Sequence, residues 1–95
     1  MKDSPTPLPT KVTLGDILEK IEATSYQVLP GTTTTVCQLK MRNGYTVLGT
    51  SACVDPSEFS AAVGEKFAFE DAIDKVWPLE GYLLAERRHQ TGAQA

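Results

Sequence analysis

Apolar residues recur at helical spacing near the start of the chain. Leu14, Ile17, Leu18 and Ile21 share one face at the three- and four-residue spacing of a helix, which predicts a short amphipathic helix over residues 14–23. Thr13, with Asp16 three positions later, has the pattern of a capping box at its start. An isolated helix this short is marginal, so we expect it to be docked on the rest of the fold.

The middle of the chain is rich in β-branched residues and is predicted to form three strands. Residues 25–29 are strand-like and end at the turn signal Pro30-Gly31. Two further β-rich runs, residues 32–41 and 46–53, flank the dipeptide Asn43-Gly44. Because Asn-Gly between such runs is the strongest short-range hairpin signal, these two strands should form a hairpin.

A two-residue turn at Asn43-Gly44 sets the expected register of this hairpin. One side, the better core candidate, then holds the pairs Leu39–Leu48, Met41–Thr46 and Cys37–Thr50. The other side holds Lys40–Val47, Val36–Ser51 and Thr34–Cys53. A slip of one residue would exchange the faces. In this register the two cysteines lie on opposite faces, so we expect free thiols.

The segment Asp55-Pro56-Ser57-Glu58 predicts the start of a second helix, because it joins an N-cap aspartate, a proline at the first helical position and a capping-box glutamate. Apolar residues then recur at helical spacing at Phe59, Ala62, Val63, Phe67, Ile73 and Trp77. Gly64 marks either close packing or a break between two helices, and Pro78 should kink or end the helix. Residues 79–88 are expected to add a final turn or two, with 89–95 as a loose tail.

These elements predict an α+β fold in one domain, residues 1–95. It should contain a short N-terminal helix, a small antiparallel sheet of about three strands with the Asn-Gly hairpin, and a long or kinked C-terminal helix. The proline-rich residues 1–12 are expected to form an extended arm. Because the core of so short a chain is thin and its sheet has open edges, we expect a homo-oligomer.

Composition limits the partners and the compartment. The net charge of −3 and the pI near 5.0 argue against coating DNA, which requires a broad basic surface. Apolar runs fall short of the ~20 residues that cross a bilayer, and the N-terminus has no signal-peptide pattern, so we expect no membrane association and a cytosolic protein. Two cysteines are too few for a zinc site unless His89 and a carboxylate join them, and His89 falls in the predicted tail, so no metal and no cofactor are expected.

No catalytic set is recognisable, so no enzymatic activity is expected. His89 is the only histidine and falls in the predicted tail, which leaves both cysteines without an obvious base. The carboxylates Glu70, Asp71 and Asp74 are clustered and could do acid–base chemistry. A solvated helix face is the more common explanation of such a cluster.

Two segments are candidates for binding a small phosphate-bearing ligand. Lys40, Arg42 and Tyr45 are expected on one side of the hairpin tip, where cations beside an aromatic ring can bind a nucleotide by charge and stacking. The other segment is a run of four threonines after a turn, Thr32, Thr33, Thr34 and Thr35. Its hydroxyls and backbone N–H groups could face a phosphate. An ordinary exposed strand and hairpin tip is the more common explanation of both segments.

Two aromatic residues near the C-terminus, Trp77 and Tyr82, are candidates for an interface. Trp and Tyr dominate the energetics of protein interfaces, so this surface could bind a second copy or another partner. Packing of the last helix against the sheet explains them as well.

The chain resembles, over residues 29–84, a family of small tailed-phage proteins named after gene product forty-nine of phage N-four and gene sixty-six of phage Sf-six. The residues that carry the resemblance are Thr35-Val36-Cys37, Arg42-Asn43-Gly44-Tyr45, Gly49-Thr50-Ser51-Ala52-Cys53-Val54, Gly64-Glu65-Lys66 and Lys75-Val76-Trp77-Pro78-Leu79-Glu80-Gly81-Tyr82-Leu83-Leu84.

This resemblance implies a phage-encoded accessory protein that acts in the cytoplasm of the infected bacterium. In that setting we expect counter-defence, by sequestration of a small nucleotide signal molecule. The alternative is a protein–protein inhibitor or adaptor that binds a host factor. Sequestration requires cations and aromatic rings around a cavity, whereas inhibition requires an exposed apolar or acidic patch.

Overall fold

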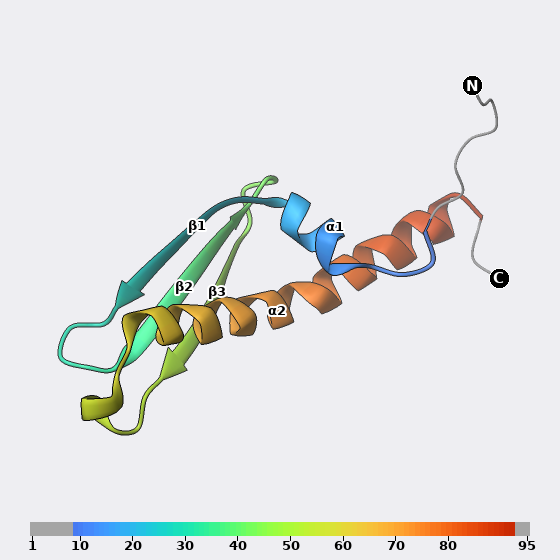
Figure 1. The fold of residues 1–95 in the computed structure, drawn as a ribbon. Coiled ribbons are helices and arrows are strands. Elements are labelled where there is room, and N and C mark those ends of the chain that lie inside the picture. Colours follow the sequence, from blue (N-terminus) through green and yellow to red (C-terminus); the bar gives the residue numbers. More distant parts are fainter. Residues whose placement is uncertain (1–8, 93–95) are drawn as a thin grey trace.

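The structure is a computed structural model that describes residues 9–92. Its elements are α1 (Leu14–Glu19), β1 (Ile21–Val28), β2 (Thr34–Met41), β3 (Thr46–Ala52), the 3₁₀ turn η1 (Pro56–Glu58) and α2 (Ala61–Gln90) (Figure 1). The predicted α+β class, with a short N-terminal helix, a three-stranded antiparallel sheet and a long C-terminal helix, is confirmed. Residues 1–8 of the expected arm and 93–95 of the expected tail lie outside the described residues.

Helix α1 is shorter than its apolar spacing predicts. The expected capping box is present, because Thr13 and Asp16 each bond the backbone N–H of the other. The helix ends at Glu19, however, and the chain enters β1 at Ile21, which pairs with Met41. The prediction of helix to residue 23 is therefore wrong, since pairing with β2 outweighs the helical spacing here.

The hairpin between β2 and β3 has a three-residue turn. The N–H of Met41 donates to the carbonyl of Tyr45 at 2.7 Å, and the N–H of Gly44 donates back to Met41 at 2.9 Å. Gly44 has φ +92, in the left-handed region that glycine occupies without strain. The Asn-Gly dipeptide therefore does form a hairpin turn, but the turn has three residues, 42–44, instead of the expected two.

This extra turn residue shifts the register and corrects the predicted pairs. Leu39 pairs with Val47 and Cys37 with Gly49, so the predicted partners Leu48 and Thr50 lie on the opposite face. On β2 the expected face is buried, but on β3 the buried positions are Val47 and Gly49, and Leu48 is 51% exposed. A shift of one residue turned over every side chain of β3.

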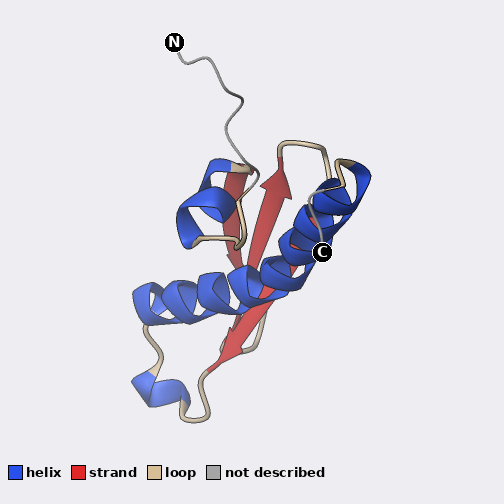
Figure 2. Cartoon of the chain, turned by 90° about the vertical axis from the view of Figure 1, so that its right-hand side faces the viewer, coloured by secondary structure: helices blue, strands red, loops and turns tan. Residues whose placement is uncertain are grey.

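Helix α2 begins later and ends later than predicted. Ser60 caps it through the N–H of Val63, while Asp55 caps only the short turn η1. The helix continues through Gly64 and through Pro78, which removes a backbone donor, and Figures 1 and 2 show it changing direction along its length. His89 and Gln90 belong to α2 rather than to a loose tail. No helix within residues 9–92 has the length and apolar character needed to span a bilayer.

The buried side of α2 is a stripe of residues four positions apart. It consists of Gly64, Ala68, Ala72, Val76, Glu80 and Leu84, with Ile73 beside it. Three of the larger apolar residues at helical spacing, Val63, Phe67 and Trp77, are exposed. Small residues thus form the part of this face that meets the sheet most closely, whereas Val63 and Phe67 are exposed.

Small residues are required there because α2 lies directly on the backbone of the sheet. A Cβ atom on Gly49 would lie 2.2 Å from the carbonyl oxygen of Ala68 and 2.3 Å from the nitrogen of Ala72. A Cβ atom on Gly64 would lie 2.5 Å from the Oγ1 of Thr35. Of the two possibilities for Gly64, close packing is therefore the one observed.

The core lies between α2 and one face of the sheet, and α1 closes one end (Figure 2). Its buried members are Ile17, Cys37, Leu39, Met41, Val47, Ala68, Ala72, Ile73 and Val76. The other face of the sheet has no helix over it in the described part of the chain (Figure 2). The protein is elongated because α2, about 45 Å long, runs past strands of about 27 Å.

Cys37 and Cys53 are free thiols, but they do not lie on opposite faces as expected. The N–H of Cys53 donates to the carbonyl of Thr33 at 3.4 Å, which continues the pairing of β2 with β3 by one residue. In this register the side chain of Cys53 lies on the helix side of the sheet, as that of Cys37 does. Four residue positions along the strand, roughly 13 Å, separate them. Distance rather than orientation therefore keeps them from forming a bridge.

We predict that Gly49→Ala lowers the free energy of unfolding by at least about 1–3 kcal/mol, because the new methyl group overlaps the backbone of α2. The matched control is Gly81→Ala, at a helical glycine with nothing within 4 Å of the added atom. It should stabilise the protein by about 0.5–1 kcal/mol, since alanine favours helix. Urea unfolding measures both, and equal effects of the two substitutions would contradict the close approach.

We predict that the two thiols react at very different rates. Burial raises the pKa of the Cys37 thiol, so less of the reactive thiolate forms there, and the side chain is inaccessible. Ellman's reagent at pH 8 should modify Cys53 in a fast phase, which Cys53→Ser removes, and Cys37 only as the protein opens. Two thiols reacting at one fast rate would contradict this packing.

Candidate functional site

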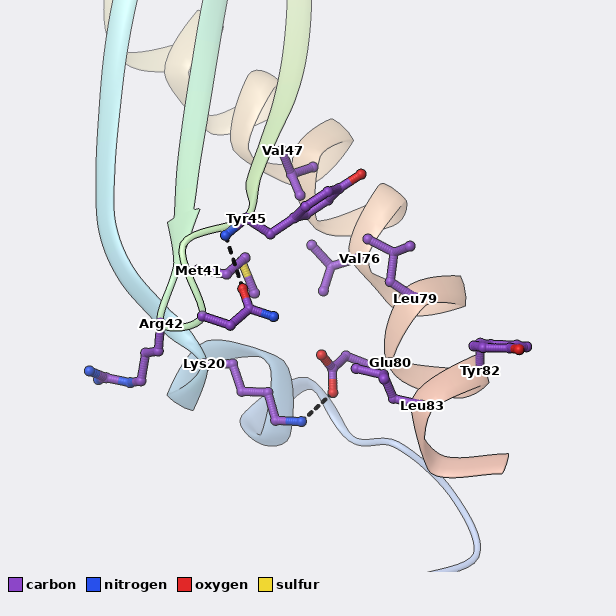
Figure 3. A pocket seen from close by; sticks show the side chains of 11 residues that line it. Lys20, Met41, Arg42, Tyr45, Val47, Val76, Leu79, Glu80, Tyr82 and Leu83 are labelled. Atoms are coloured by element: carbon purple, nitrogen blue, oxygen red, sulfur yellow. Dashed lines mark hydrogen bonds and ion pairs between the residues drawn. The ribbon is translucent and has the colours of Figure 1, made fainter. Parts of the chain in front are cut away.

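A groove of about 550 Å³ lies at the end of the molecule that carries the hairpin tip. It is bounded by the β2–β3 turn, by the end of α1 and by the second half of α2 (Figure 3). Its lining residues are Lys20, Met41, Arg42, Asn43, Tyr45, Val47, Val76, Leu79, Glu80, Tyr82 and Leu83. This volume is in the range of small-molecule sites, roughly 300–1,000 Å³.

The three-residue turn places Tyr45 on the groove. Tyr45 pairs with Met41 through the bond that closes the turn, so it has the orientation of the helix-facing strand residues. Its N–H donates to the Oδ1 of Asn43 at 3.0 Å, which fixes the start of β3. The Tyr45 side chain is 58% exposed, and Figure 3 shows its ring on the side of the groove opposite Leu79.

The walls of the groove are apolar. Met41 and Val47 contribute from the sheet, and Val76, Leu79 and Leu83 contribute from α2 (Figure 3). Leu79 and Leu83 are both exposed, so a good part of this apolar surface is open to solvent. An open apolar groove of this kind favours a ligand with a flat, poorly hydrated part.

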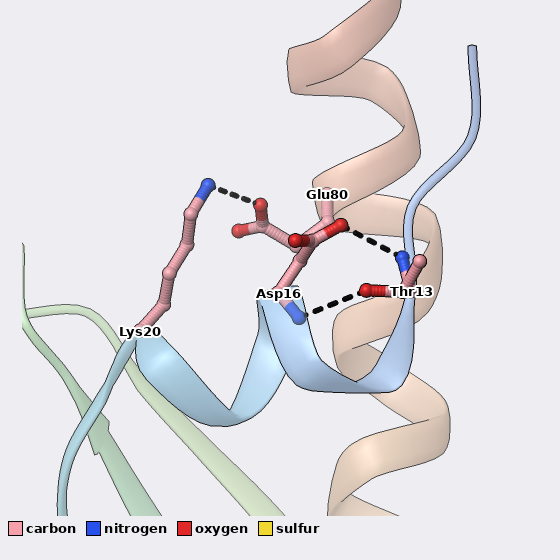
Figure 4. A network of polar contacts seen from close by, with 4 residues as sticks. All are labelled: Thr13, Asp16, Lys20 and Glu80. Carbon is pink, nitrogen blue, oxygen red and sulfur yellow. Dashed lines mark hydrogen bonds and ion pairs between the residues drawn. The ribbon is translucent and has the colours of Figure 1, made fainter. Parts of the chain in front are cut away.

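One charged pair forms the floor. The Nζ of Lys20 lies 2.5 Å from the Oε1 of Glu80, with 40% of the lysine side chain and 8% of the glutamate side chain exposed (Figures 3 and 4). Lys20 is there because it is the C-cap of α1, and Glu80 because it continues the inward stripe of α2. A buried carboxylate requires such a partner, since an unpaired charge in the interior is very unfavourable.

The capping box of α1 holds Lys20 in place. The N–H of Thr13 donates to Asp16 at 2.8 Å and the N–H of Asp16 donates to Thr13 at 3.1 Å (Figure 4). The hydrogen bond from the Thr13 backbone holds the pKa of the Asp16 carboxyl below its usual value. The charged form of Asp16 therefore fixes the start of the helix whose end carries Lys20.

The predicted ligand residues of the hairpin tip do not share one side. Lys40 lies on the uncovered face of the sheet, where its Nζ is 3.7 Å from the carboxylate of Glu22. The Nε of Arg42 donates to the carbonyl of Glu19 at 2.6 Å, and Figure 3 shows its guanidinium turned away from the groove. Only Tyr45 faces the cavity, because the shifted register separates it from Lys40.

The predicted threonine segment lies at the other end of β2, roughly 24 Å from the hairpin tip. The hydroxyl of Thr32 donates to Leu29 at 2.8 Å, and that of Thr33 donates to Cys53 at 2.5 Å. Thr34 is half-buried, and Thr35 is fully buried beneath Gly64. The two predicted segments therefore do not form one site within a chain.

The two predicted interface residues, Trp77 and Tyr82, point in different directions. Five helical positions separate them, which is about 140° around the helix. Tyr82 lines the groove and is 71% exposed, while Trp77 lies outside the groove. They do not make one continuous aromatic surface.

The acidic cluster on α2 has a structural role at one position. Asp71 accepts a hydrogen bond from the N–H of Thr50 at 2.9 Å, and it lies 3.6 Å from the Nζ of Lys75. Glu70 and Asp74 are exposed. Within residues 9–92 no three His, Cys, Asp or Glu side chains are grouped closely enough to hold a metal ion.

Lys20, Glu80, Leu79 and Leu83 are site residues that the sequence patterns did not reveal. A signal for Glu80 was present, because an acid stands four positions after Val76 in the stripe that faces inward. Lys20 carried no such signal, since its role depends on where α1 ends and how it docks on α2.

The comparison with protein families matches residues 12–88 to the phage protein family described as N4 Gp49/phage Sf6 gene 66. The chain belongs to this family. All the residues that line the groove fall within the matched range. Searches of curated proteins and of solved structures found no match. This is a phage protein, and the family match confirms the resemblance seen in the sequence.

We predict that Lys20→Met lowers the free energy of unfolding by about 1–2 kcal/mol, because it leaves the buried carboxylate of Glu80 without its charged hydrogen bond. This value is reduced from that of a fully buried pair because the lysine side chain is partly exposed to solvent. The double substitution Lys20→Met/Glu80→Leu should recover most of this loss, since no buried charge remains. Chemical unfolding of both variants and of Glu80→Leu completes a double-mutant cycle. Additive effects would show that the pair is not coupled.

Proposed function

We propose that this phage protein is an accessory binding protein that sequesters a small nucleotide signal molecule of the host's defence. The observation that carries the proposal is the groove, in which an aromatic ring, apolar walls and a lysine converge in a chain of net charge −3. In an acidic protein such a local grouping is what a phosphate-bearing ring compound requires.

The base of a nucleotide fits the apolar part of the groove. The ring of Tyr45 provides a stacking surface, and Leu79 and Leu83 lie across from it (Figure 3). Stacking of a base on an aromatic side chain contributes about 1–3 kcal/mol. The amide NH₂ of Asn43 remains available for the base, because the bond from Tyr45 uses the amide oxygen.

The phosphate fits the floor and the rim. An ammonium group has three donors, and the bond to Glu80 occupies one donor of Lys20, so two can reach a phosphate. Arg42 lines the rim, and although its guanidinium is turned away from the groove, its charge adds positive potential there. Glu80 keeps Lys20 in position and lends the floor selectivity, because it disfavours ligands with a second anionic group at that depth.

We further propose that the protein binds its ligand without transforming it, in the host bacterial cytoplasm where such a signal would be encountered. The ionisable side chains that line the groove are Lys20, Arg42, Tyr45, Glu80 and Tyr82. This set has neither a nucleophile paired with a base nor a pair of carboxylates. Chromatography of the ligand after prolonged incubation should recover it unchanged.

We predict that titration against linear and cyclic mono- and dinucleotides identifies at least one ligand with micromolar affinity. Tyr45→Ala should weaken its binding by at least about five-fold, the lower end of a lost stacking contact. Arg42→Gln removes a positive charge at the groove and should weaken binding. Its matched control, Lys40→Gln, removes the same charge from the opposite face of the sheet and should leave binding unchanged. If no nucleotide binds or shifts the melting temperature, the proposal is wrong.

The second candidate function is inhibition of a host protein. It is favoured by exposed apolar side chains on α1 and on the second half of α2, namely Leu14, Leu18, Leu79, Tyr82 and Leu83. Patches of this kind mark protein interaction sites. Leu18→Glu separates the two functions, because Leu18 does not line the groove: it should weaken binding of a protein on this surface, whereas Tyr45→Ala is the substitution that most weakens a nucleotide.

A further inference from the structure

Within residues 9–92, side chains of α2 cover part of one edge of the sheet, and nothing covers the other edge. On β3 the residues that bond to β2 are the odd-numbered ones, as the Met41–Tyr45 bond shows, so the even-numbered residues direct their backbone groups outward. Side chains of α2 reach two of these. Asp71 accepts from the N–H of Thr50 at 2.9 Å, and Lys75 donates to the carbonyl of Leu48 at 2.7 Å.

The outward edge of β1 has no such cover. The N–H of Leu29 donates to Thr34 at 3.0 Å, and because the ladder alternates, the outward backbone groups belong to Thr24, Tyr26 and Val28. All three residues are exposed, and no other described segment bonds to their backbone groups. Six hydrogen-bonding groups therefore lie along one edge of the sheet.

The side chains of this edge lack the features that usually prevent strand pairing. Residues 23–29 contain no charge and no proline. The nearest charge along the strand is Glu22, at the irregularity where β1 begins, and Lys40 already pairs with it. Tyr26 is 39% and Val28 40% exposed, on the side of the sheet where α2 covers β2 and β3 (Figure 2).

We propose that β1 is a dimerisation edge, to which a second copy of this chain adds its own β1 in antiparallel orientation. The occupant is a second copy because the outward residues are symmetric about Tyr26. A two-fold axis at Tyr26 pairs Thr24 with the partner's Val28 and Tyr26 with the partner's Tyr26. All six outward groups of each chain are then bonded, and the two sheets become one of six strands.

The same pairing covers the half-exposed side chains. Thr24, Tyr26 and Val28 pair with the buried residues Leu39, Cys37 and Thr35 of β2, so their side chains lie on the helix side. In the dimer the two Tyr26 rings lie side by side between the two α2 helices. Aromatic cross-strand pairs of this kind stabilise antiparallel sheets.

The dimer leaves the proposed nucleotide site unchanged. None of the residues that line the groove belongs to residues 23–29, so each dimer carries two grooves away from its axis. The dimerisation edge and the binding function can therefore fail or succeed separately.

Sedimentation equilibrium of the full chain tests the proposal. The wild type should have twice the chain mass of 10.3 kDa at high micromolar concentration. Thr24→Lys/Val28→Lys should sediment as a monomer, because each cross-axis pair then joins two cations. Thr24→Lys/Val28→Glu should restore the dimer, because each new cation then faces a new carboxylate of the partner.

The matched control is Thr46→Lys/Ala52→Lys, which adds the same two charges to exposed, outward residues of β3 and should leave the dimer intact. Circular dichroism and urea unfolding confirm that each variant is folded. A monomeric wild type, a dimeric double-lysine variant of β1, or a monomeric lysine–glutamate variant would each overturn the proposal. The monomeric variant keeps its groove, so its nucleotide binding reports on the proposed function alone.

Discussion

The fold depends on the contact of α2 with the backbone of the sheet at Gly49. There the carbonyl of Ala68 and the nitrogen of Ala72 occupy the space of a missing side chain. Van der Waals contacts are individually weak, and their sum is large only where surfaces fit closely. This contact, with Gly64 over Thr35, sets the distance between the layers and selects small residues for the inward stripe of α2.

The position of the groove follows from that contact. Because α2 is held against β2 and β3 along its first half, its second half runs beyond the sheet and past the hairpin tip (Figure 1). The space between them is closed at the bottom by α1, which Lys20 joins to Glu80. The Lys20–Glu80 pair thus lies where the β2–β3 hairpin, α1 and α2 meet. The result is an apolar groove that contains one available ammonium group. That combination is the basis of the proposed nucleotide site.

The same packing leaves the two edges of the sheet unequal. Asp71 and Lys75 lie on the side of α2 next to β3, where they bond its outward backbone groups. No element of the described chain does this for β1, whose exposed residues carry unpaired groups. An uncovered edge without charges or proline favours pairing with another strand. One chain thus offers a ligand groove at one place and a symmetric edge at another.

The sequence by itself determined the elements that depend on local chemistry: the capping box of Thr13 and Asp16, the Asn-Gly hairpin, the three-strand α+β class and the long C-terminal helix. These depend on neighbouring residues, whose hydrogen bonds and backbone preferences act over a few positions. Tertiary structure alone decided the face of β3, because one residue in the turn reverses every side chain. It also decided the face of α2, because helical spacing alone did not show whether Phe67 and Trp77 or the alanines meet the sheet, and the close approach to Gly49 required alanine. For the same reason Lys20 and Glu80, 60 positions apart, were not recognisable as one site until the packing of α1 on α2 brought them together.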